Sequence, residues 1–502
     1  MEDFSMPNNP NSKLKKLLCA VLAALLLTGC GGSVPEETAG STPTEVEANA
    51  EPNTTAEEAE ETEAEVLLVD AIPSADYNGY TFNYITEYWE GTVADRFLRE
   101  MHADEITGEP INDAVWERNS YVEEKLNIKI TAGDSTAPAT DVQAAVKAGD
   151  DVYQLAGAYK FNTFPLLRQG VLRDWNDLPG LDLTGEWWNS EAIAKLSILG
   201  RQYMMSGSIL MSEIDDTLAM VFNKKLQNDY GLDNIYDLVA DGKWTLDKMS
   251  VMVEKVSSDL DGDGQMVFGN DLFGYVQDPA SMTYNWCFSL DLLNGKVAED
   301  NTYDWNINTE RVMTSLEQLA QMLGNSNTDT NTEYYEGLDV FAEGKIYIYS
   351  IILSALEIIR EMEDDFGIIP YPKLEESQSQ YYNHVGSQSP ILAIPVTNVS
   401  DDGRTAAILN ALAIASHQYV RPVYFENVLK GKLSRDPQTQ VMLDIIQKSA
   451  TYDIGYLAGS TPLTSISNLI KAKQTDFASA WAKNEKGLTK QMNNLIAKIL
   501  EQ

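Results

Sequence analysis

Cysteine and basic residues are scarce in this chain, and each shortage excludes a class of protein. Three cysteines occur in 502 residues, and 36 lysines and arginines stand against 76 aspartates and glutamates, for a formal net charge of −40. A nucleic-acid-binding surface needs clustered basic side chains to neutralise phosphates, and no basic stripe is present. Nucleic acid is therefore excluded as a partner.

Recognisable catalytic motifs are also missing. The chain has neither a G-x-S-x-G nor an H-E-x-x-H motif, and its histidines, His102, His384 and His417, are far apart in sequence. A pair of carboxylates for glycoside hydrolysis remains open, because acidic residues are so abundant. The motifs do not predict an enzyme.

An apolar run near the N-terminus is too short to cross a bilayer comfortably as a helix. It extends from Leu17 to Leu27, after three lysines, which is the pattern of a signal peptide. The following LTGC, residues 27–30, resembles a bacterial lipobox, in which a peptidase cuts before the cysteine and the thiol carries lipid. We expect residues 1–29 to be a lipoprotein signal peptide and Cys30 to anchor the protein to the membrane. The alternative is a plain signal peptide with an incidental cysteine.

An acidic segment follows Cys30. Residues 31–70 contain twelve acidic side chains, no basic side chain and no aromatic residue. Such a segment cannot bury enough apolar area to offset the entropy of ordering it. We therefore expect residues 30–76 to be the lipidated cysteine followed by a disordered tether, which its own charge repulsion extends.

The cysteines predict no internal disulfide. Cleavage would remove Cys19 and acylation would occupy Cys30, so Cys287 has no partner within the chain. Cys287 lies in the aromatic stretch YNWCFSL and is expected to pack as a small buried hydrophobe. The stability must come from a large core, which roughly 425 residues can build.

Predicted strands and helices alternate after the tether. Runs of aromatic and β-branched residues predict strands at TFNYI, NIKI, VYQLAGAY and TLAMVFN. Apolar residues at helical spacing predict helices at INDAVWERNSYVEEKL (111–126) and at RTAAILNALAIASHQY (404–419), the clearest amphipathic pattern. This alternation is typical of an α/β fold with largely parallel sheets, and the length favours two lobes.

Several stretches occur in an order that points to a family. They are INDAVWERNSYVEEKLNIKI, AGDDVYQLAG, LLRQGVLRDWNDLP, MVFNKKLQNDYGL, DGKWTLDKM, VFAEGKIYIY, DFGIIPYPK and LKGKLSRDPQTQVMLDIIQ. In this order they resemble bacterial extracellular solute-binding proteins of the maltodextrin-binding type (family 1), the lipoprotein components of carbohydrate ABC importers. The resemblance covers nearly all of residues 77–460.

The resemblance implies a two-lobed periplasmic-binding-protein-like fold (type II), with hinge crossings and a ligand cleft between the lobes. Residues 77–502 would be the solute-binding domain, with a first lobe at about 77–212 and 390–450 and a second lobe at about 213–389 and 451–502. It also implies a monomer that is not an enzyme, requires no cofactor, and passes a sugar or oligosaccharide to a transporter permease. The protein would sit in the cell envelope, lipid-anchored to the outer face of the membrane of a Gram-positive bacterium.

Sugar binding has a recognisable chemistry. Aromatic side chains stack on the apolar face of the ring, and polar side chains bind its hydroxyl groups in a pocket that excludes water. In open α/β sheets, ligands bind beyond the carboxyl ends of the strands. Two predicted strands end in suitable residues, and the family places ligand contacts in both loops, so the first-lobe candidates are Glu87, Trp89, Tyr159 and Lys160. The two aromatic candidates have an alternative role, which is to cap the edge of the sheet.

Further candidates come from the second lobe and the hinge. The resemblance places a cleft aromatic at Tyr349, hinge carboxylates at Glu213 and Asp216, and a second crossing at Ser387. The carboxylates would bind solute hydroxyls or cap backbone groups, and both readings stay open. The pair Trp187–Trp188 also fits the family pattern, although at least one of two adjacent indoles should lie in the core.

One motif predicts a metal site. Asp259, Asp261 and Asp263 are followed by Gly264 at positions 1, 3, 5 and 6 of a loop that resembles an EF-hand, with Gln265 next in the chain. The end of the loop departs from the pattern, since Asn270 stands where a bidentate glutamate is usual. A structural calcium ion and a plain solvated turn are the two alternatives.

Other functions for the same fold remain open at this stage. A peptide-, amino-acid- or amine-binding protein needs an acidic, aromatic cleft, which this chain also offers. A surface-anchored glycoside hydrolase would need only two suitably spaced carboxylates. A partner role for a membrane sensor kinase is a further alternative that the sequence does not test.

Overall fold

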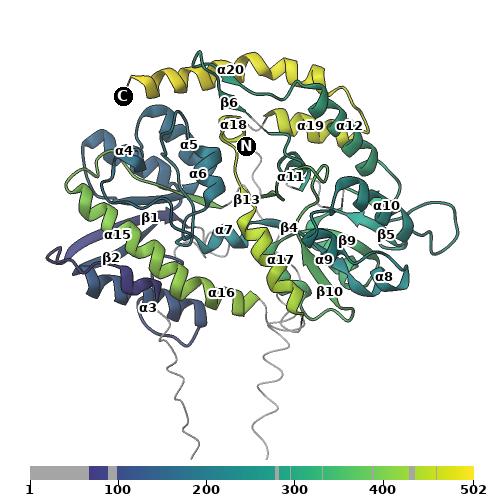
Figure 1. Cartoon of the computed structure of the whole chain (residues 1–502), viewed down its shortest axis with the longest axis horizontal. Helices are drawn as coiled ribbons and strands as arrows, with labels where there is room; N and C mark the ends of the chain where they lie inside the picture. The colour runs from purple at the N-terminus through teal and green to yellow at the C-terminus, as the bar shows by residue number, and fades with distance from the viewer. Residues whose placement is uncertain are drawn as a thin grey trace, which may run out of the picture. The chain divides into compact units, whose positions relative to one another are not determined.

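The computed structural model describes residues 67–88, 99–277, 282–293, 295–330, 332–386, 389–428, 436–459 and 461–501. They form a mixed α/β body built on two main sheets (Figure 1). The predicted signal peptide, Cys30, Trp89 and Ser387 lie outside the described residues. Residues 67–76, which the sequence assigns to the tether, are held against this body. Val69 and Ile72 are buried, and the Tyr121 hydroxyl donates to the Val69 carbonyl oxygen at 2.8 Å.

The first sheet has the strand order β12-β3-β1-β2. Its strands are β1 (Tyr80–Glu87), β2 (Ile128–Ser135), β3 (Leu155–Tyr159) and β12 (Pro390–Ala393). Strand β1 is parallel to β2 and β3, whereas β12 is antiparallel to β3. Helices α3 (Pro110–Leu126) and α15 (Asp402–Ala415) lie on one side of this sheet, and α4 (Pro138–Ala148) and α5 (Lys160–Gln169) on the other (Figure 1).

The second sheet has the order β10-β4-β9-β5-β8. Its strands are β4 (Leu218–Asn223), β5 (Phe273–Val276), β8 (Thr328–Asp329), β9 (Ile346–Ile352) and β10 (Phe366–Ile369). Two of its pairings are parallel and two antiparallel. The sheets are therefore more mixed than the strand–helix alternation predicts.

Helices cover the second sheet and connect it to the rest of the body. Those packed against its strands are α8 (Lys224–Asp229), α9 (Ile235–Ala240), α10 (Leu246–Val256), α13 (Tyr334–Ala342) and α17 (Pro437–Lys448). Further helices are α6 (Ser190–Leu196), α11 (Met282–Ser289), α12 (Glu310–Leu323), α14 (Leu356–Ile359), α16 (Arg421–Val428), α18 (Ile454–Ala458), α19 (Thr461–Lys471) and α20 (Phe477–Leu500). Helix α20 runs along the top in Figure 1 and reaches α5, where Lys498 donates to the Arg168 carbonyl oxygen.

Local sequence explains where these helices begin and end. Helix α3 begins at Glu109, whose side chain accepts a hydrogen bond from the Asn112 amide, and stops at Asn127 in a left-handed conformation. The helix predicted at 111–126 is confirmed. Helix α15 differs from its amphipathic prediction, because nine of its residues are buried. It packs against α3 and the N-terminal residues 68–71, so little of its surface is left for solvent.

The body holds one free thiol. Cys287 is buried on α11 with 2% of its surface exposed, as the sequence predicts, and burial raises its pKa to about 12.

Two short segments cross between the sheets. Helix α7 (Met211–Asp215) is a single turn that leads from the first sheet into β4. The second crossing runs from β11 (Asn383–His384) toward β12, and β11 pairs with β13 (Ala450–Thr451). The first hinge crossing therefore includes a helical turn.

Candidate functional site

The parallel strands of the first sheet end in the residues that the sequence selects. Glu87 is the last residue of β1, and Tyr159 is the last residue of β3. The buried Glu87 carboxylate accepts hydrogen bonds from the Tyr159 amide at 2.9 Å and from the Asn162 side chain at 3.4 Å. Glu87 therefore ties the ends of two neighbouring strands together.

Lys160 joins this strand end to the second crossing. Its side chain is 1% exposed, and its ammonium group donates to the carbonyl oxygens of Val385, at 2.6 Å, and Gly386. Burial lowers the pKa of Lys160, while the carboxylates of Asp216 and Glu213 favour its charged form. A buried ammonium group is thus held by backbone carbonyls, with acidic groups nearby.

Asp216 ends α7 beside the same crossing. Its carbonyl oxygen accepts from the Gly386 amide at 2.7 Å, and a Cβ atom on Gly386 would lie 2.6 Å from the Asp216 carboxylate. Only glycine fits that approach. Burial and the negative charges of Glu87 and Asp216 raise the pKa of Tyr159 to about 12, which places both carboxylates near its hydroxyl. We call Glu87, Tyr159, Lys160 and Asp216 the strand-end group.

An aromatic group lies next to the strand-end group. The ring of Tyr456 on α18 contacts four other rings, at centroid distances of 5.0 Å to Phe161, 6.1 Å to Tyr284, 5.5 Å to Phe288 and 5.4 Å to His384. Phe161 follows the carboxyl end of β3 in the first sheet, and α11, which carries Tyr284 and Phe288, follows the carboxyl end of β5 in the second. Helices that follow strands of both sheets therefore meet around Tyr456. Sequence reasoning missed this group, although Phe161 directly follows two selected residues.

Tyr349, the predicted cleft aromatic of the second lobe, has a packing role in this structure. It is fully buried in β9, and its ring lies 6.2 Å from that of Phe341. A Cβ atom on Gly337 would come within 2.7 Å of the ring, which shows how closely α13 covers it. Trp286 is also a core residue, and its indole nitrogen donates to the Gln277 side chain at 2.8 Å.

Helix α7 makes a different contact on another of its sides. The amide and hydroxyl of Ser212 donate to the two carboxylate oxygens of Glu100 at 2.8 and 2.9 Å. Glu100 is buried, and burial raises its pKa to about 8. The guanidinium of Arg118 on α3 donates to the Glu100 backbone carbonyl oxygen at 2.8 Å. Glu100 therefore links α7, which binds its carboxyl group, to α3, which binds its backbone.

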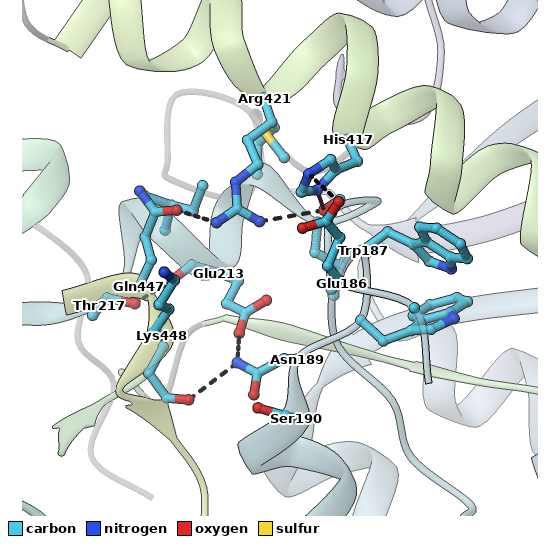
Figure 2. A pocket seen from close by; sticks show the side chains of 18 of the residues that line it. Glu186, Trp187, Asn189, Ser190, Glu213, Thr217, His417, Arg421, Gln447 and Lys448 are labelled. Carbon is cyan, nitrogen blue, oxygen red and sulfur yellow. Dashed lines mark hydrogen bonds and ion pairs between the residues drawn. The ribbon is translucent and has the colours of Figure 1, made fainter. Parts of the chain in front are cut away.

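A pocket of about 290 Å³ lies against a third side of α7 (Figure 2). We call it the hinge pocket. Its lining comes from four parts of the chain, residues 184–190, 207–217, 417–421 and 447–450. Of the sequence-predicted ligand residues that the structure describes, Glu213 alone lines it.

Polar contacts hold the walls of the hinge pocket. The buried Glu213 carboxylate accepts from the Ser206 hydroxyl at 2.7 Å and from the Asn189 side chain, which also donates to the Ala450 carbonyl oxygen at 3.1 Å. Arg421 donates to the Ser208 hydroxyl at 3.4 Å and to the Gln447 side-chain oxygen. Burial raises the pKa of Glu213 and lowers that of Arg421.

Of the two adjacent tryptophans beside this pocket, one lies in the core, as expected. Trp188 is 4% exposed, and its indole nitrogen donates to the Asp182 carbonyl oxygen at 2.8 Å. Its ring meets that of Trp175 edge to face at 5.6 Å, which makes it a core residue. Trp187 is only partly buried.

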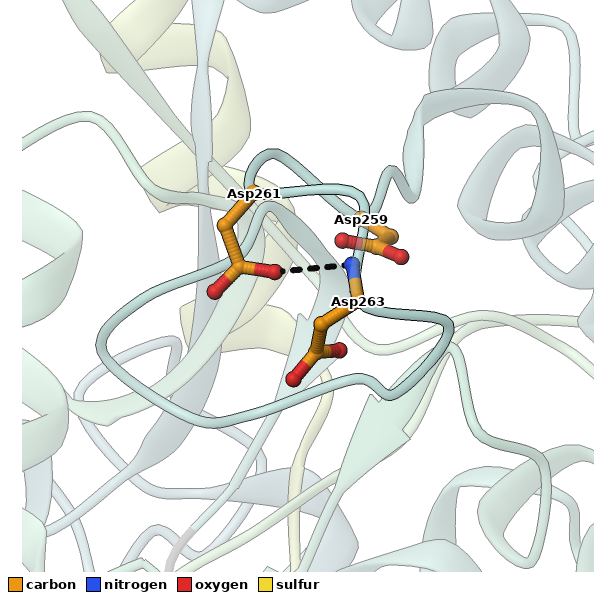
Figure 3. A group of neighbouring side chains, drawn as sticks. All are labelled: Asp259, Asp261 and Asp263. Atoms are coloured by element: carbon orange, nitrogen blue, oxygen red, sulfur yellow. Dashed lines mark hydrogen bonds between the residues drawn. The ribbon is translucent and has the colours of Figure 1, made fainter.

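The aspartate loop forms a compact turn (Figure 3). Carboxylate oxygens of Asp259, Asp261 and Asp263 lie within 4.8 Å of one another. Asp259 accepts from the amides of Gly262 and Gly264 at 2.6 and 2.7 Å, and these bonds lower its pKa. Gln265 donates its amide to Asp263, and Asn270 belongs to the next turn, where its amide binds the Val267 carbonyl oxygen.

Three clustered carboxylates suit a hard cation such as Ca²⁺, which takes six to eight oxygen ligands. Asp271 does not extend the cluster, because it is buried and accepts from the amides of Leu260 and Val267. The calcium ion stays a prediction.

No helix in the described part of the chain combines the length and apolar character needed to cross a membrane.

Comparison by sequence finds little, whereas comparison by structure is informative. No family model and no curated protein matches the chain. The cyclic alpha-maltosyl-1,6-maltose binding protein from Arthrobacter globiformis is similar over 83% of this chain and 100% of its own, with 14% identity and a TM-score of 0.55. A family 1 extracellular solute-binding protein from Bifidobacterium longum subsp. infantis covers 84% and 99%, with 12% identity and a TM-score of 0.51.

A third solved structure has a different ligand. UgpB from Mycobacterium tuberculosis in complex with glycerophosphocholine is similar over 78% of this chain and 98% of its own, with 16% identity and a TM-score of 0.50. Together with the two sheets and their crossings, these similarities give the chain a two-lobe periplasmic-binding-protein-like fold.

Proposed function

We propose that this protein is an extracellular substrate-binding protein that captures a sugar or oligosaccharide between its lobes and delivers it to an ABC importer. The observation that carries the proposal is the contact around Tyr456 of Phe161 and Tyr284, whose helices follow strands of different sheets. Carbohydrate-binding proteins of the same fold support the ligand class. In this role the protein is a monomer, needs no cofactor and is not an enzyme.

The chemistry of the two groups suits a carbohydrate. The partly buried rings of Phe161 and Tyr284 offer apolar faces for stacking, and Glu87, Tyr159 and Asp216 offer acceptors and a donor for hydroxyl groups. Phe161 lies on α5, which follows β3 of the first sheet, and Tyr284 lies on α11, which follows β5 of the second, so a solute bound between them would contact both lobes. The solute favours closure of the two lobes only through contacts that it makes in the closed arrangement and not in the open one. The importer would then distinguish loaded from empty protein by lobe orientation.

A ligand screen by thermal shift tests the proposal. Maltose, linear and cyclic maltodextrins, glycerophosphocholine, peptides, amino acids and amines should be compared at matched concentrations. A specific solute at 100 times its dissociation constant should stabilise the protein by about 2.7 kcal/mol. Failure of every carbohydrate, with a clear response to a peptide, amine or phosphodiester, would transfer the proposal to that ligand class. Hydrolysis of the carbohydrate during the assay would support the glycoside hydrolase alternative.

Substitution of one ring tests the location. Phe161→Ala should remove on the order of 1.5–3 kcal/mol of apolar burial, or roughly a 10- to 150-fold loss of carbohydrate affinity. Tyr335→Ala is the matched control, because Tyr335 is an exposed aromatic residue on α13. Equal affinity of Phe161→Ala and the control would place the solute elsewhere.

The same proposal puts the protein in the cell envelope, attached to the outer face of the membrane of a Gram-positive bacterium through lipid on Cys30. The support is the LTGC sequence and the acidic segment after it. Cys30→Ser should release the protein into the medium or leave it unprocessed. An unmodified N-terminus elsewhere, found by mass spectrometry of the mature protein, would contradict the anchor.

A further inference from the structure

The hinge pocket has walls that belong to both sheets. Ser208 and Asn189 lie in a segment tied to the first sheet, where Met205 and Leu392 of β12 exchange backbone hydrogen bonds at 2.8 and 2.9 Å. Gln447 and Lys448 end α17, which packs against β10 of the second sheet. Glu213 comes from the crossing helix α7 itself. Any rotation of one sheet relative to the other must therefore change the shape of this pocket.

Charged side chains of both signs line the pocket, namely Glu186, Glu213, Arg421 and Lys448 (Figure 2). Arg421 and Glu213 are the two that are at least partly buried, and they come from different walls. The partly buried guanidinium of Arg421 donates to two neutral oxygens, those of Ser208 and Gln447. Among the residues that the structure describes, no ion pair joins Arg421 to a carboxylate, although the negative charges of Glu213, Asp444 and Glu186 act at longer range to raise its pKa. Buried charges are normally paired, so a guanidinium without a carboxylate partner favours a ligand with an anionic group.

The opposite wall rules out a simple anion. Glu213 is 6% exposed and presents its carboxyl group to the same pocket. A ligand with a carboxylate alone would be repelled by this group when it is ionised. A ligand that also carries an ammonium group would satisfy both walls. Leu210, Met211 and Ile214 add an apolar lining for a small side chain.

From this geometry we infer that the hinge pocket is a second binding site, for a small zwitterion of the α-amino-acid class. The ligand carboxylate pairs with Arg421 and its ammonium group with Glu213. Arg421 is suited to the first contact, because its planar guanidinium can hold a carboxylate by two parallel hydrogen bonds. A volume of about 290 Å³ is at the small end of ligand pockets and matches an amino acid better than an oligosaccharide.

Occupation of this site would act on solute capture, and this part of the inference rests on the proposed function. In the present structure the pocket has a volume of about 290 Å³, and rings carried by helices that follow both sheets are in contact around Tyr456. A ligand that fills the pocket stabilises this arrangement, so it should raise carbohydrate affinity. By linkage, the carbohydrate must raise amino-acid affinity by the same factor.

Calorimetric titration of the full chain tests the site. Glycine, L-alanine, L-serine and L-leucine are the probes, each without carbohydrate. At least one should bind with a stoichiometry of one. For L-leucine, the matched analogues are leucinamide, which lacks the carboxylate, and 4-methylpentanoate, which lacks the ammonium group. Each analogue should bind at least about tenfold more weakly than the amino acid, since each loses a charge-assisted contact.

Variants test the residues. Arg421→Gln and Glu213→Gln should each weaken amino-acid binding by roughly 10- to 100-fold. Arg311→Gln should leave it unchanged, because Arg311 is exposed on α12 and does not line the pocket. Arg421→Lys retains the charge but loses the planar fork, so an intermediate loss is expected even if the glutamine variant folds poorly.

Three results would overturn the inference. They are the absence of binding by every amino acid, equal binding of 4-methylpentanoate and leucine, and unchanged binding in Arg421→Gln and Arg421→Lys. Loss of amino-acid binding in Phe161→Ala but not in the Arg421 variants would also overturn it, because the amino acid would then occupy the aromatic group. Amino-acid binding that depends on Arg421, without any carbohydrate binding, would support the second site and contradict the proposed function.

Discussion

The ammonium group of Lys160 lies 5.2 Å from the centroid of the Tyr452 ring. Tyr452 is buried directly after β13, and Glu213 of the hinge pocket contributes to the raised pKa of its hydroxyl. The ring therefore stands between the strand-end group and the hinge pocket. A displacement of either group must be accommodated by the same buried side chain.

Lys160 should be important for stability as well as for solute binding. Lys160→Met removes the donor for the carbonyl oxygens of Val385 and Gly386, which remain buried. We expect a loss of about 1–3 kcal/mol in the free energy of unfolding, measured by urea denaturation. Lys147→Met is the matched control, because Lys147 is exposed on α4. Equal stability of the two variants would show that the carbonyl contacts contribute nothing.

Glu100 should give the protein a pH-dependent stability. Its pKa is raised to about 8 in the folded state, against about 4.3 in an unfolded chain. The folded state therefore binds more protons between these values, and the contribution of Glu100 to stability falls as pH rises from about 4.5 to 8. The melting temperature of Glu100→Gln should thus fall less over this range than that of the wild type.

The control for this experiment is an exposed glutamate on α3. Glu117 is exposed on α3, so Glu117→Gln should retain the pH dependence of the wild type. A Glu100→Gln profile parallel to that of the wild type between pH 5 and 8 would contradict the assignment.

Tyr349 should matter for folding and not for solute contact. Tyr349→Ala leaves a cavity under α13, and the free energy of unfolding should fall by about 3–5 kcal/mol. Tyr349→Phe retains the ring, so its carbohydrate affinity should equal that of the wild type. A large loss of affinity in a stably folded Tyr349→Phe would return this residue to the ligand site.

The aspartate loop should respond to calcium if it holds the ion. Removal of calcium with a chelator should lower the melting temperature of the wild type, and Asp261→Asn should abolish that response. Asp339→Asn, an exposed acidic residue on α13, should respond like the wild type. Identical melting of the wild type with and without chelator would leave the loop a plain turn.

Much of the fold can be predicted from the sequence, because in many segments the local residue pattern and the tertiary packing favour the same secondary structure. The strand at TLAMVFN became β4, and the helix at 111–126 became α3. The antiparallel pairing of β12 and β10 cannot be predicted from local sequence, since each strand pairs with a strand that is distant in the chain. The burial of α15 was also missed, because alanine and leucine suit both an amphipathic and an enclosed helix.

The site was only partly accessible. Glu87, Tyr159, Lys160 and Asp216 were selected from strand ends and the hinge, and the structure brings them together. Whether they contact solute stays a prediction, as do the lobe boundaries. Tyr456 was missed because it comes from a distant part of the chain that packs beside β3 only in the folded state.

The buried thiol of Cys287 has a practical consequence for measuring lobe movement. Nucleophilic attack needs the thiolate, and a thiol that is 2% exposed with a pKa of about 12 supplies almost none at neutral pH. A chain without its signal peptide that carries Cys30→Ser would therefore be inert to thiol-directed labels. Cysteines introduced at the exposed positions Lys147 and Asp339 would then be the sole reactive groups, one beside each sheet. A fluorophore pair at these two positions would report the distance between the lobes directly as solute is added.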